Sequence, residues 1–259
     1  MNDLKLGKLP AKEDIRTLKL ASVLAVELPK APPEWEFDKD NKVTIPLYMF
    51  GNDRYGDCVM AGRAHQTLRF EYVEQKKVIK ISDSDVTGEY FSETGGADQG
   101  LVVLDSLKEW RTKGWKTDAG FWGFGRKTYT IHAFASINIK KQEEIKIAIY
   151  LFNGIGLGIE VYQSTMDQFD RGNFWDVVPN QGKYLGGHYI YIVGYNKVGP
   201  ICVTWGKKQQ MTWAFFDKYT DEAYAVIDER DSWLYDKSPV NTDTLEMYLE
   251  QVERMVAVE

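Results

Sequence analysis

A cysteine at the start of a predicted helix is the residue of this 259-residue chain best placed to do chemistry. It is Cys58, and it follows the stretch Gly51-Asn52-Asp53-Arg54-Tyr55-Gly56-Asp57, whose glycine, asparagine and aspartate residues favour a tight turn. Small and apolar residues then recur at helical spacing. Because the free N–H groups and positive dipole of a helix N-terminus favour a thiolate, we expect a lowered pKa at Cys58.

A candidate base for this thiol lies 130 residues downstream, at His188 in Gly186-Gly187-His188. An imidazole titrates near neutral pH and can accept a proton from a thiol. The pair therefore predicts a nucleophile and its base. Each residue alone has a simpler explanation, since Cys58 could be a small buried side chain and His188 a core histidine with its ring nitrogens bonded.

The elements that must bring these residues together divide into a helical first half and a mostly β second half. The patterns predict helices over 58–74, from a cap at Ser82 or Asp83 to Phe91, around 104–110 with an end near Gly114, over 143–153 and over 242–256. They predict strands over 78–81, 128–139, 156–161, 188–195, 200–205, 211–216 and 223–227, with a loop over 167–184. We expect an α+β fold with its site in a cleft between the two halves.

The domain boundaries follow from the same patterns. Prolines give residues 1–45 an extended path, so we expect an N-terminal arm that docks either on its own domain or on a neighbouring subunit. One domain then covers 46–235, with a helical lobe over about 50–125 and a β lobe over about 126–235. A C-terminal helix over 236–259 completes the chain.

Composition excludes several classes of function. A net charge of −6, with no cluster of basic residues, argues against nucleic-acid binding. The charged first twenty residues and the lack of a long apolar run predict neither a signal peptide nor a membrane span, so we expect a soluble cytoplasmic protein. Two cysteines, Cys58 and Cys202, suit a reducing compartment, and Cys202 reads as inert core. His65 has no metal-ligand spacing around it, and we expect neither metal nor cofactor.

Several segments fall in an order that resembles the papain-like cysteine peptidase superfamily over roughly residues 45–230. Besides the helix-opening cysteine and the distant histidine, they are Gly95-Gly96 before a helix, the helix-glycine-strand step over 143–161, the strand 186–195 that ends Val-Gly-Tyr, and Val203-Thr204-Trp205-Gly206 followed by Trp213. The resemblance implies a helical left lobe and an antiparallel, β-barrel-like right lobe. It also implies hydrolysis of peptide or amide bonds in a protein or peptide substrate.

Site roles carry over from this resemblance residue by residue. Cys58 is implied to be the nucleophile and His188 the general base and acid. Asn52, six residues before the cysteine, stands where the family has its oxyanion glutamine. Trp205 is expected to cover the histidine, and the loop Phe121–Gly125 to line a cleft.

The chain departs from the family at four positions. Asn52 is one methylene shorter than the family's glutamine. Tyr55 stands where many members of the family have a disulfide-bonded cysteine, and Val59 stands where they have an aromatic residue. The fourth, Val203, falls where the family has the asparagine that orients the histidine ring, and valine has no hydrogen-bonding group. Thr204 is the candidate third residue in its place, although strand alternation is expected to turn it to the opposite face.

Two functions of different class therefore compete. The first is a thiol hydrolase that uses a Cys58/His188 dyad. The second is a catalytically weakened papain-like fold that serves as a structural or binding module. The Gly-Asn-Asp…Gly-Asp-Cys stretch and its proline-rich lead-in resemble proteins of bacteriophage and bacterial genomes, which implies for example a virion component or a subunit partner for the arm. A transglutaminase-like acyl transferase, which shares the thiol chemistry, is a third hypothesis.

Overall fold

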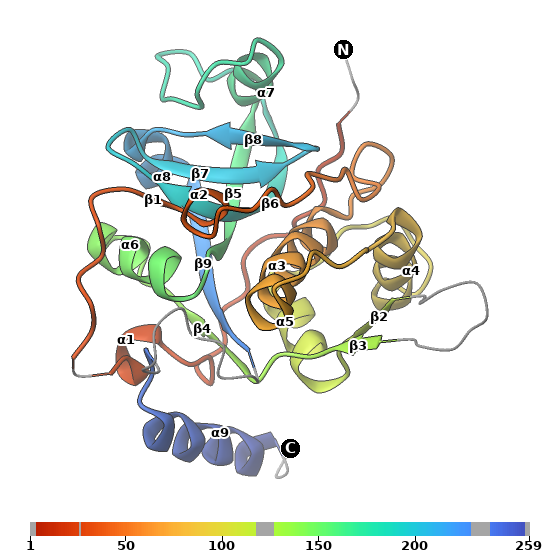
Figure 1. The fold of residues 1–259 in the computed structure, drawn as a ribbon. Helices are drawn as coiled ribbons and strands as arrows, with labels where there is room; N and C mark the ends of the chain where they lie inside the picture. Colours follow the sequence, from red (N-terminus) through yellow and green to blue (C-terminus); the bar gives the residue numbers. More distant parts are fainter. Residues whose placement is uncertain (1–3, 26, 118–126, 229–238, 257–259) are drawn as a thin grey trace.

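An antiparallel sheet forms the β half of the molecule (Figure 1). The computed structural model describes residues 4–25, 27–117, 127–228 and 239–256. Within them the strand order is β4-β9-β5-β6-β7-β8, with β1 also paired to β6. The strands are β1 (Trp35–Glu36), β4 (Ala133–Ser136), β5 (Ile155–Tyr162), β6 (Tyr184–Tyr195), β7 (Pro200–Thr204), β8 (Lys207–Gln210) and β9 (Thr220–Ile227). The β lobe is thus an open sheet and not a closed barrel, which is broadly consistent with the predicted barrel-like antiparallel lobe.

The helical half lies beside this sheet in Figure 1. It contains α3 (Cys58–Gln75), α4 (Asp83–Glu93), α5 (Val103–Thr112) and a hairpin of β2 (Trp115–Thr117) with β3 (Lys127–Tyr129). The remaining helices are α1 (Leu20–Val23), α2 (Phe37–Asp40), α6 (Gln142–Leu151), α7 (Gln163–Asp170), α8 (Trp213–Tyr219) and α9 (Thr242–Val256). The predicted combination of helices with an antiparallel sheet is confirmed.

Helix α3 is the central element, and it is buried on nearly every side. Its two buried arginines are paired in opposite directions. Arg63 forms an ion pair with Glu93 of α4 and stacks over Trp110 of α5 at 5.0 Å. Arg69 lies 3.2 Å from Asp38 of α2. A buried charge is tolerated only when it is paired, so these contacts fix α3 between the helical lobe and the segment that leads to the sheet.

Local signals in the sequence predict several helix boundaries correctly. Ser82 caps α4 by accepting a hydrogen bond from the Asp85 amide, and the Asp85 carboxylate in turn accepts one from the Ser82 amide. This reciprocal pair satisfies N–H groups that lack a partner within the helix. The predicted helices that begin at Cys58 and at Thr242 begin at those residues.

Four predicted elements differ from the structure. Residues 78–81 form no strand, and 128–139 divide into β3 and β4. Part of the predicted loop over 167–184 is the end of α7. The strand predicted over 211–216 is instead the start of a helix, because Thr212 accepts a hydrogen bond from the Phe215 amide and begins α8. A good N-cap decides for a helix where a short apolar run is ambiguous.

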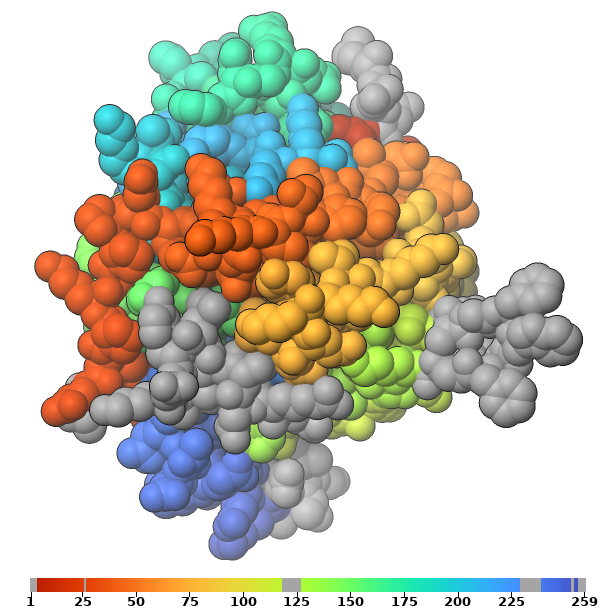
Figure 2. Space-filling model, in the orientation of Figure 1, coloured from red at the N-terminus to blue at the C-terminus, as the bar shows by residue number. Residues whose placement is uncertain are grey.

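The N-terminal segment docks on its own chain. In Figure 1 its red trace passes between the helical half and the sheet before it reaches α1. Figure 2 shows the orange residues, about 27–55, crossing one face of the molecule between the blue strands and the yellow helices. None of the described helices combines the length and the apolar character needed to cross a bilayer.

Candidate active site

Helix α3 and strand β6 approach closely where Cys58 lies. A Cβ atom added to Gly62, one turn after Cys58, would lie 2.6 Å from the Tyr189 ring, so this approach requires glycine. The Tyr189 amide donates a hydrogen bond to Cys58 Sγ at 3.4 Å. The thiol is therefore held against the residue that follows His188.

The His188 ring is fixed on two sides. Its Nε2 lies 2.7 Å from Thr204 Oγ1, and the ring stacks on Trp205 with 4.0 Å between centroids and 13° between planes. The predicted cover by Trp205 is confirmed. The other nitrogen, Nδ1, is buried and has no hydrogen-bond partner among the described residues. When the Thr204 hydroxyl accepts a hydrogen bond from Nε2–H, the Nδ1 lone pair is free to take a proton.

Thr204 reaches the ring because of the strand register. Val203 lies opposite Tyr191 in the β6–β7 pair, and paired residues share a face of the sheet. Tyr191 is three residues from His188 and hence on the other face, where Val203 packs against Tyr191 and Val193. The expectation that alternation turns Thr204 away from the histidine is therefore wrong.

Asn52 directs its amide at a main-chain carbonyl from another segment. The side chain is buried, and its Nδ2 donates to Tyr55 O at 3.1 Å and to Lys5 O at 3.4 Å. Trp205 Nε1 donates to the same Lys5 carbonyl at 3.3 Å. Two donors thus converge on a carbonyl near the proposed site, and the residue that supplies this carbonyl belongs to the N-terminal arm.

Residues 5–9, which we call the cleft segment, pair with both walls of the site. On the sheet side, the Lys8 amide donates to Gly187 O at 3.2 Å. On the helical side, the Leu101 amide donates to Gly7 O at 2.8 Å and the Leu9 amide to Leu101 O at 2.9 Å. These are strand-like contacts, so the cleft between the lobes accepts an extended chain.

Glycine at position 7 lets this segment lie against the helical wall. A Cβ atom on Gly7 would lie 1.7 Å from the carbonyl oxygen of Gly56 in the turn before Cys58. No other residue type fits there without displacing the segment. The main chain of the arm therefore touches the turn that leads to the thiol.

Comparison with solved structures identifies this architecture. The structure superposes on that of xylellain, a cysteine protease from Xylella fastidiosa, with a TM-score of 0.65 and 16% identity over 88% of this chain and 98% of that one. It superposes on proCathepsin B S9 from Trypanosoma congolense with a TM-score of 0.62 and 12% identity over 87% of each chain. The Carica candamarcensis protease CMS1MS2 gives 0.53 and 14% identity over 77% of this chain and 100% of that one.

The fold is papain-like. No protein-family model matches the sequence, and the search of curated proteins found no match. Recognition from the order of short motifs is thus confirmed at the level of the fold.

Burial sets the electrostatics of this papain-like cleft. It raises the pKa of the Cys58 thiol to about 11, against the opposing effect of the Tyr189 and Gly7 amides. It lowers the pKa of His188 to about 3. The prediction of a lowered thiol pKa is therefore wrong while the cleft is occupied, because desolvation outweighs the helix N-terminus. At neutral pH the thiol and the imidazole are both uncharged.

The other described candidate residues lie in surroundings that give them no chemical role. His65 Nε2 lies 3.0 Å from Tyr48 O, and no group of three or more His, Cys, Asp or Glu side chains in the described part of the chain could hold a metal. Cys202 is buried, and both cysteines are free thiols. Asp57 stands at the N-cap of α3, but its side chain accepts no capping hydrogen bond. The loop Phe121–Gly125 lies outside the described residues.

Sequence reasoning missed the cleft segment. Only a weak signal was present, since Leu4 and Leu6 alternate with Lys5 ahead of Pro10, which is typical of a short extended chain. What the pattern did not contain is the partner of this strand. Contacts between Gly7 and residues 56 and 101 depend on the folded path of the whole chain.

Proposed function

We propose that this protein is a thiol peptidase that cleaves peptide or amide bonds in protein or peptide substrates, and that the cleft segment holds it latent. The observation that carries the proposal is the His188 ring. It is oriented by Thr204 and Trp205, its Nδ1 is unbonded, and it adjoins the residue that contacts Cys58 Sγ.

The proposed chemistry is acyl transfer. His188 Nδ1 takes the proton of Cys58, and the thiolate attacks the substrate carbonyl to form a C–S bond. Asn52 Nδ2 and the Cys58 amide, which has no acceptor within its helix, stabilise the oxyanion. The imidazolium returns its proton to the leaving amine as the C–N bond breaks. Water then hydrolyses the thioester with His188 as base, which restores the thiol.

Latency follows from where the cleft segment lies. A substrate carbonyl that used Asn52 as a donor would compete with Lys5 O for the same Nδ2. An extended substrate would also compete with the segment for Gly187 O and the Leu101 amide. The segment must leave before substrate binds, and its departure would return water to the Cys58 and His188 side chains and reduce the desolvation that keeps both neutral.

Displacement of the cleft segment in the full chain tests the proposal. Gly7→Val introduces a side chain where Gly56 O lies, and Gly88→Ala is the matched control because a Cβ there meets nothing within 4 Å. We expect Gly7→Val to hydrolyse casein or fluorogenic peptides and to lose at least about 10³-fold in rate on Cys58→Ala or His188→Ala. Hydrolysis that survives Cys58→Ala would contradict the proposal.

The neutral state of the site favours one second candidate, a papain-like fold that serves as a structural or binding module. A thiol with a pKa of about 11 beside an imidazole with a pKa of about 3 is inert at neutral pH. This candidate predicts no turnover after displacement of the segment. It also predicts that Cys58→Ala leaves the biological role, for example assembly of a virion, intact.

A further inference from the structure

The side chain of Lys8 enters a closed acidic pocket in the β lobe. Only 1% of this side chain is exposed, although its main chain belongs to the cleft segment. Its Nζ lies 2.6 Å from Asp221 Oδ2 and 3.1 Å from Glu222 Oε1, both on β9. It also donates to the Leu9 carbonyl at 3.2 Å. The ammonium group is therefore held by two adjacent carboxylates.

The pocket is built by the sheet. Gly158 of β5 lies opposite Glu222 of β9, and a Cβ atom on Gly158 would lie 2.2 Å from Lys8 Cε and 2.6 Å from Asp221 Oδ1. The absence of a side chain at this position makes the space that the aliphatic stem of Lys8 fills. Because β5 and β9 are paired strands of the sheet, their walls do not depend on the arm.

Charge makes the pocket selective. The carboxylate of Glu222 is almost fully buried, with 6% of its side chain exposed, and Asp221 is 30% exposed. Glu222 Oε2 also accepts a hydrogen bond from the Tyr224 hydroxyl at 3.1 Å. If Lys8 leaves with the cleft segment, two neighbouring carboxylates lose the cation between them. A new basic side chain would restore the pairing, whereas a neutral or acidic one would not.

We propose that this pocket recognises a lysine or arginine side chain of an extended peptide substrate, with Asp221 and Glu222 as specificity-determining residues and Lys8 as the resident occupant. Identification of the ligand as a substrate rests on the proposed peptidase function. The pocket belongs to the substrate residue whose amide bonds Gly187 O, next to His188, as the Lys8 amide does. Recognition is therefore close to the reacting bond.

The test uses the full chain carrying Gly7→Val and blocked, fluorescent peptides Lys-Leu-Gly-X-Leu, which copy residues 5–9 with one position varied. We expect X = Lys or Arg to bind at least 10-fold more tightly than X = Gln, and X = Glu to bind most weakly. Asp221→Asn with Glu222→Gln should reduce the preference of Lys over Gln to less than 2-fold. Asp217→Asn removes one negative charge from an exposed residue of α8, as Asp221→Asn alone does in the pocket, and should leave the preference intact.

Gly158→Ala supplies a test of the pocket's shape. It should weaken peptides with X = Lys at least 10-fold and leave those with X = Ala nearly unchanged, because only the long side chain enters the pocket. If the double carboxylate variant fails to fold, Asp221→Asn alone gives the same reading. If Gly7→Val leaves the cleft closed, Lys8→Glu displaces the segment by repulsion, with Lys12→Glu as its control.

Equal binding of the Lys and Gln peptides to the opened wild-type pocket would overturn this inference. The result is separable from the proposed function. Lysine-selective binding without turnover would support the pocket as a peptide-binding site and would contradict the proposed peptidase function. Turnover without any preference at X would leave the peptidase standing and would remove the pocket.

Discussion

The Thr204 hydroxyl lies 2.7 Å from His188 Nε2, and we propose that it orients the histidine ring as the third residue of the site. A hydroxyl can accept from Nε2–H, so it can hold the tautomer in which Nδ1 keeps the free lone pair of a base. Its hydrogen bond is shielded by the Trp205 ring, which stacks on the histidine at 4.0 Å.

We predict that Thr204→Val in the Gly7→Val background lowers kcat about 10-fold, the equivalent of one lost hydrogen bond of about 1.4 kcal/mol. Valine has the shape of threonine without its acceptor, so the ring loses its orientation and little else. Thr204→Ser should keep most of the activity. Steady-state kinetics measure kcat for both variants, and equal kcat values for the Val and Ser variants would contradict a positioning role for Thr204.

At the residue scale, the sequence predicted which side chains to consider but not all of their contacts. Cys58 and His188 stood out from residue type and order. Val203 and Thr204 were assigned to the wrong faces, because the register of β7 on β6 shifts between Ile192 and Gly194. Such an irregularity exchanges the faces of neighbouring residues and leaves no mark in the pattern of side chains.

At the scale of the element, the start of α3 carries a buried carboxyl directly before the thiol. Burial raises the pKa of Asp57 from 3.8 to about 8, against the opposing effect of the Asn52 side chain. Between these two values the folded protein holds a proton that the unfolded chain releases. Stability from Asp57 is therefore fully present below about pH 3.8 and is lost as the pH rises through about 8.

We predict that Asp57→Asn removes much of this loss. The free energy of unfolding of the wild type should fall between pH 5 and pH 8.5 by on the order of 2 kcal/mol more than that of the variant. Asp53→Asn is the control, since Asp53 lies in the same turn with half of its side chain exposed. Urea denaturation at the two pH values measures the difference. Parallel pH dependence in wild type and Asp57→Asn would show that the carboxyl is not buried as described.

Elements with their own start signals were predicted best. The α4 cap at Ser82 and the long amphipathic α9 are specified by nearby residues, and the structure has them as expected. The apolar run at 211–216 is ambiguous by itself, and its start signal is the Thr212 N-cap of α8. The strand expected at 78–81 has no such signal, and its state depends on whether a partner strand is available in the folded chain.

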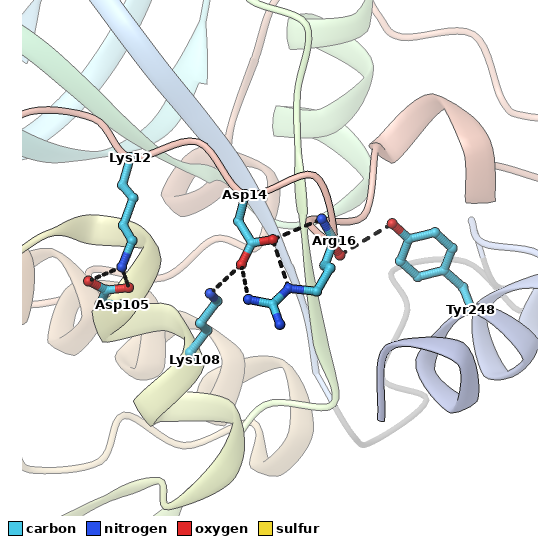
Figure 3. Close-up of polar contacts among 6 residues, drawn as sticks. All are labelled: Lys12, Asp14, Arg16, Asp105, Lys108 and Tyr248. Atoms are coloured by element: carbon cyan, nitrogen blue, oxygen red, sulfur yellow. Dashed lines mark hydrogen bonds and ion pairs between the residues drawn. The ribbon is translucent and has the colours of Figure 1, made fainter. Parts of the chain in front are cut away.

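At the scale of the molecule, the N-terminal arm connects elements that are distant in sequence. Beyond the cleft segment, it is anchored by the polar contacts of Figure 3. Lys12 lies 2.9 Å from Asp105 and Asp14 lies 2.7 Å from Lys108, both partners being on α5, and the Tyr248 hydroxyl of α9 donates to Arg16 O at 3.2 Å. Hydrogen bonds from Arg16 and Lys108 hold the pKa of Asp14 well below its usual range.

Under the proposed latency, the cleft segment is the part of the arm that leaves, while these anchors hold the rest. The exposed pair of Lys12 with Asp105 contributes little, whereas the Asp14 carboxylate is largely buried and keeps two cationic partners. The arm can thus stay attached to α5 and α9 while residues 5–9 leave the cleft. The sequence left open whether the arm docks on its own domain or on a neighbouring subunit, because the residues of an extended segment do not identify the segment with which it pairs.

The rate at which iodoacetamide alkylates Cys58, measured against pH by mass spectrometry of the intact fold, tests the central claim most directly. We predict slow reaction of Cys58 in the wild type, with a midpoint near pH 11. In Gly7→Val the midpoint should fall by at least about 2 pH units, and His188→Ala should abolish that fall. A Cys58 that reacts as slowly as Cys202 after displacement of the cleft segment, or whose profile ignores His188, would contradict the account.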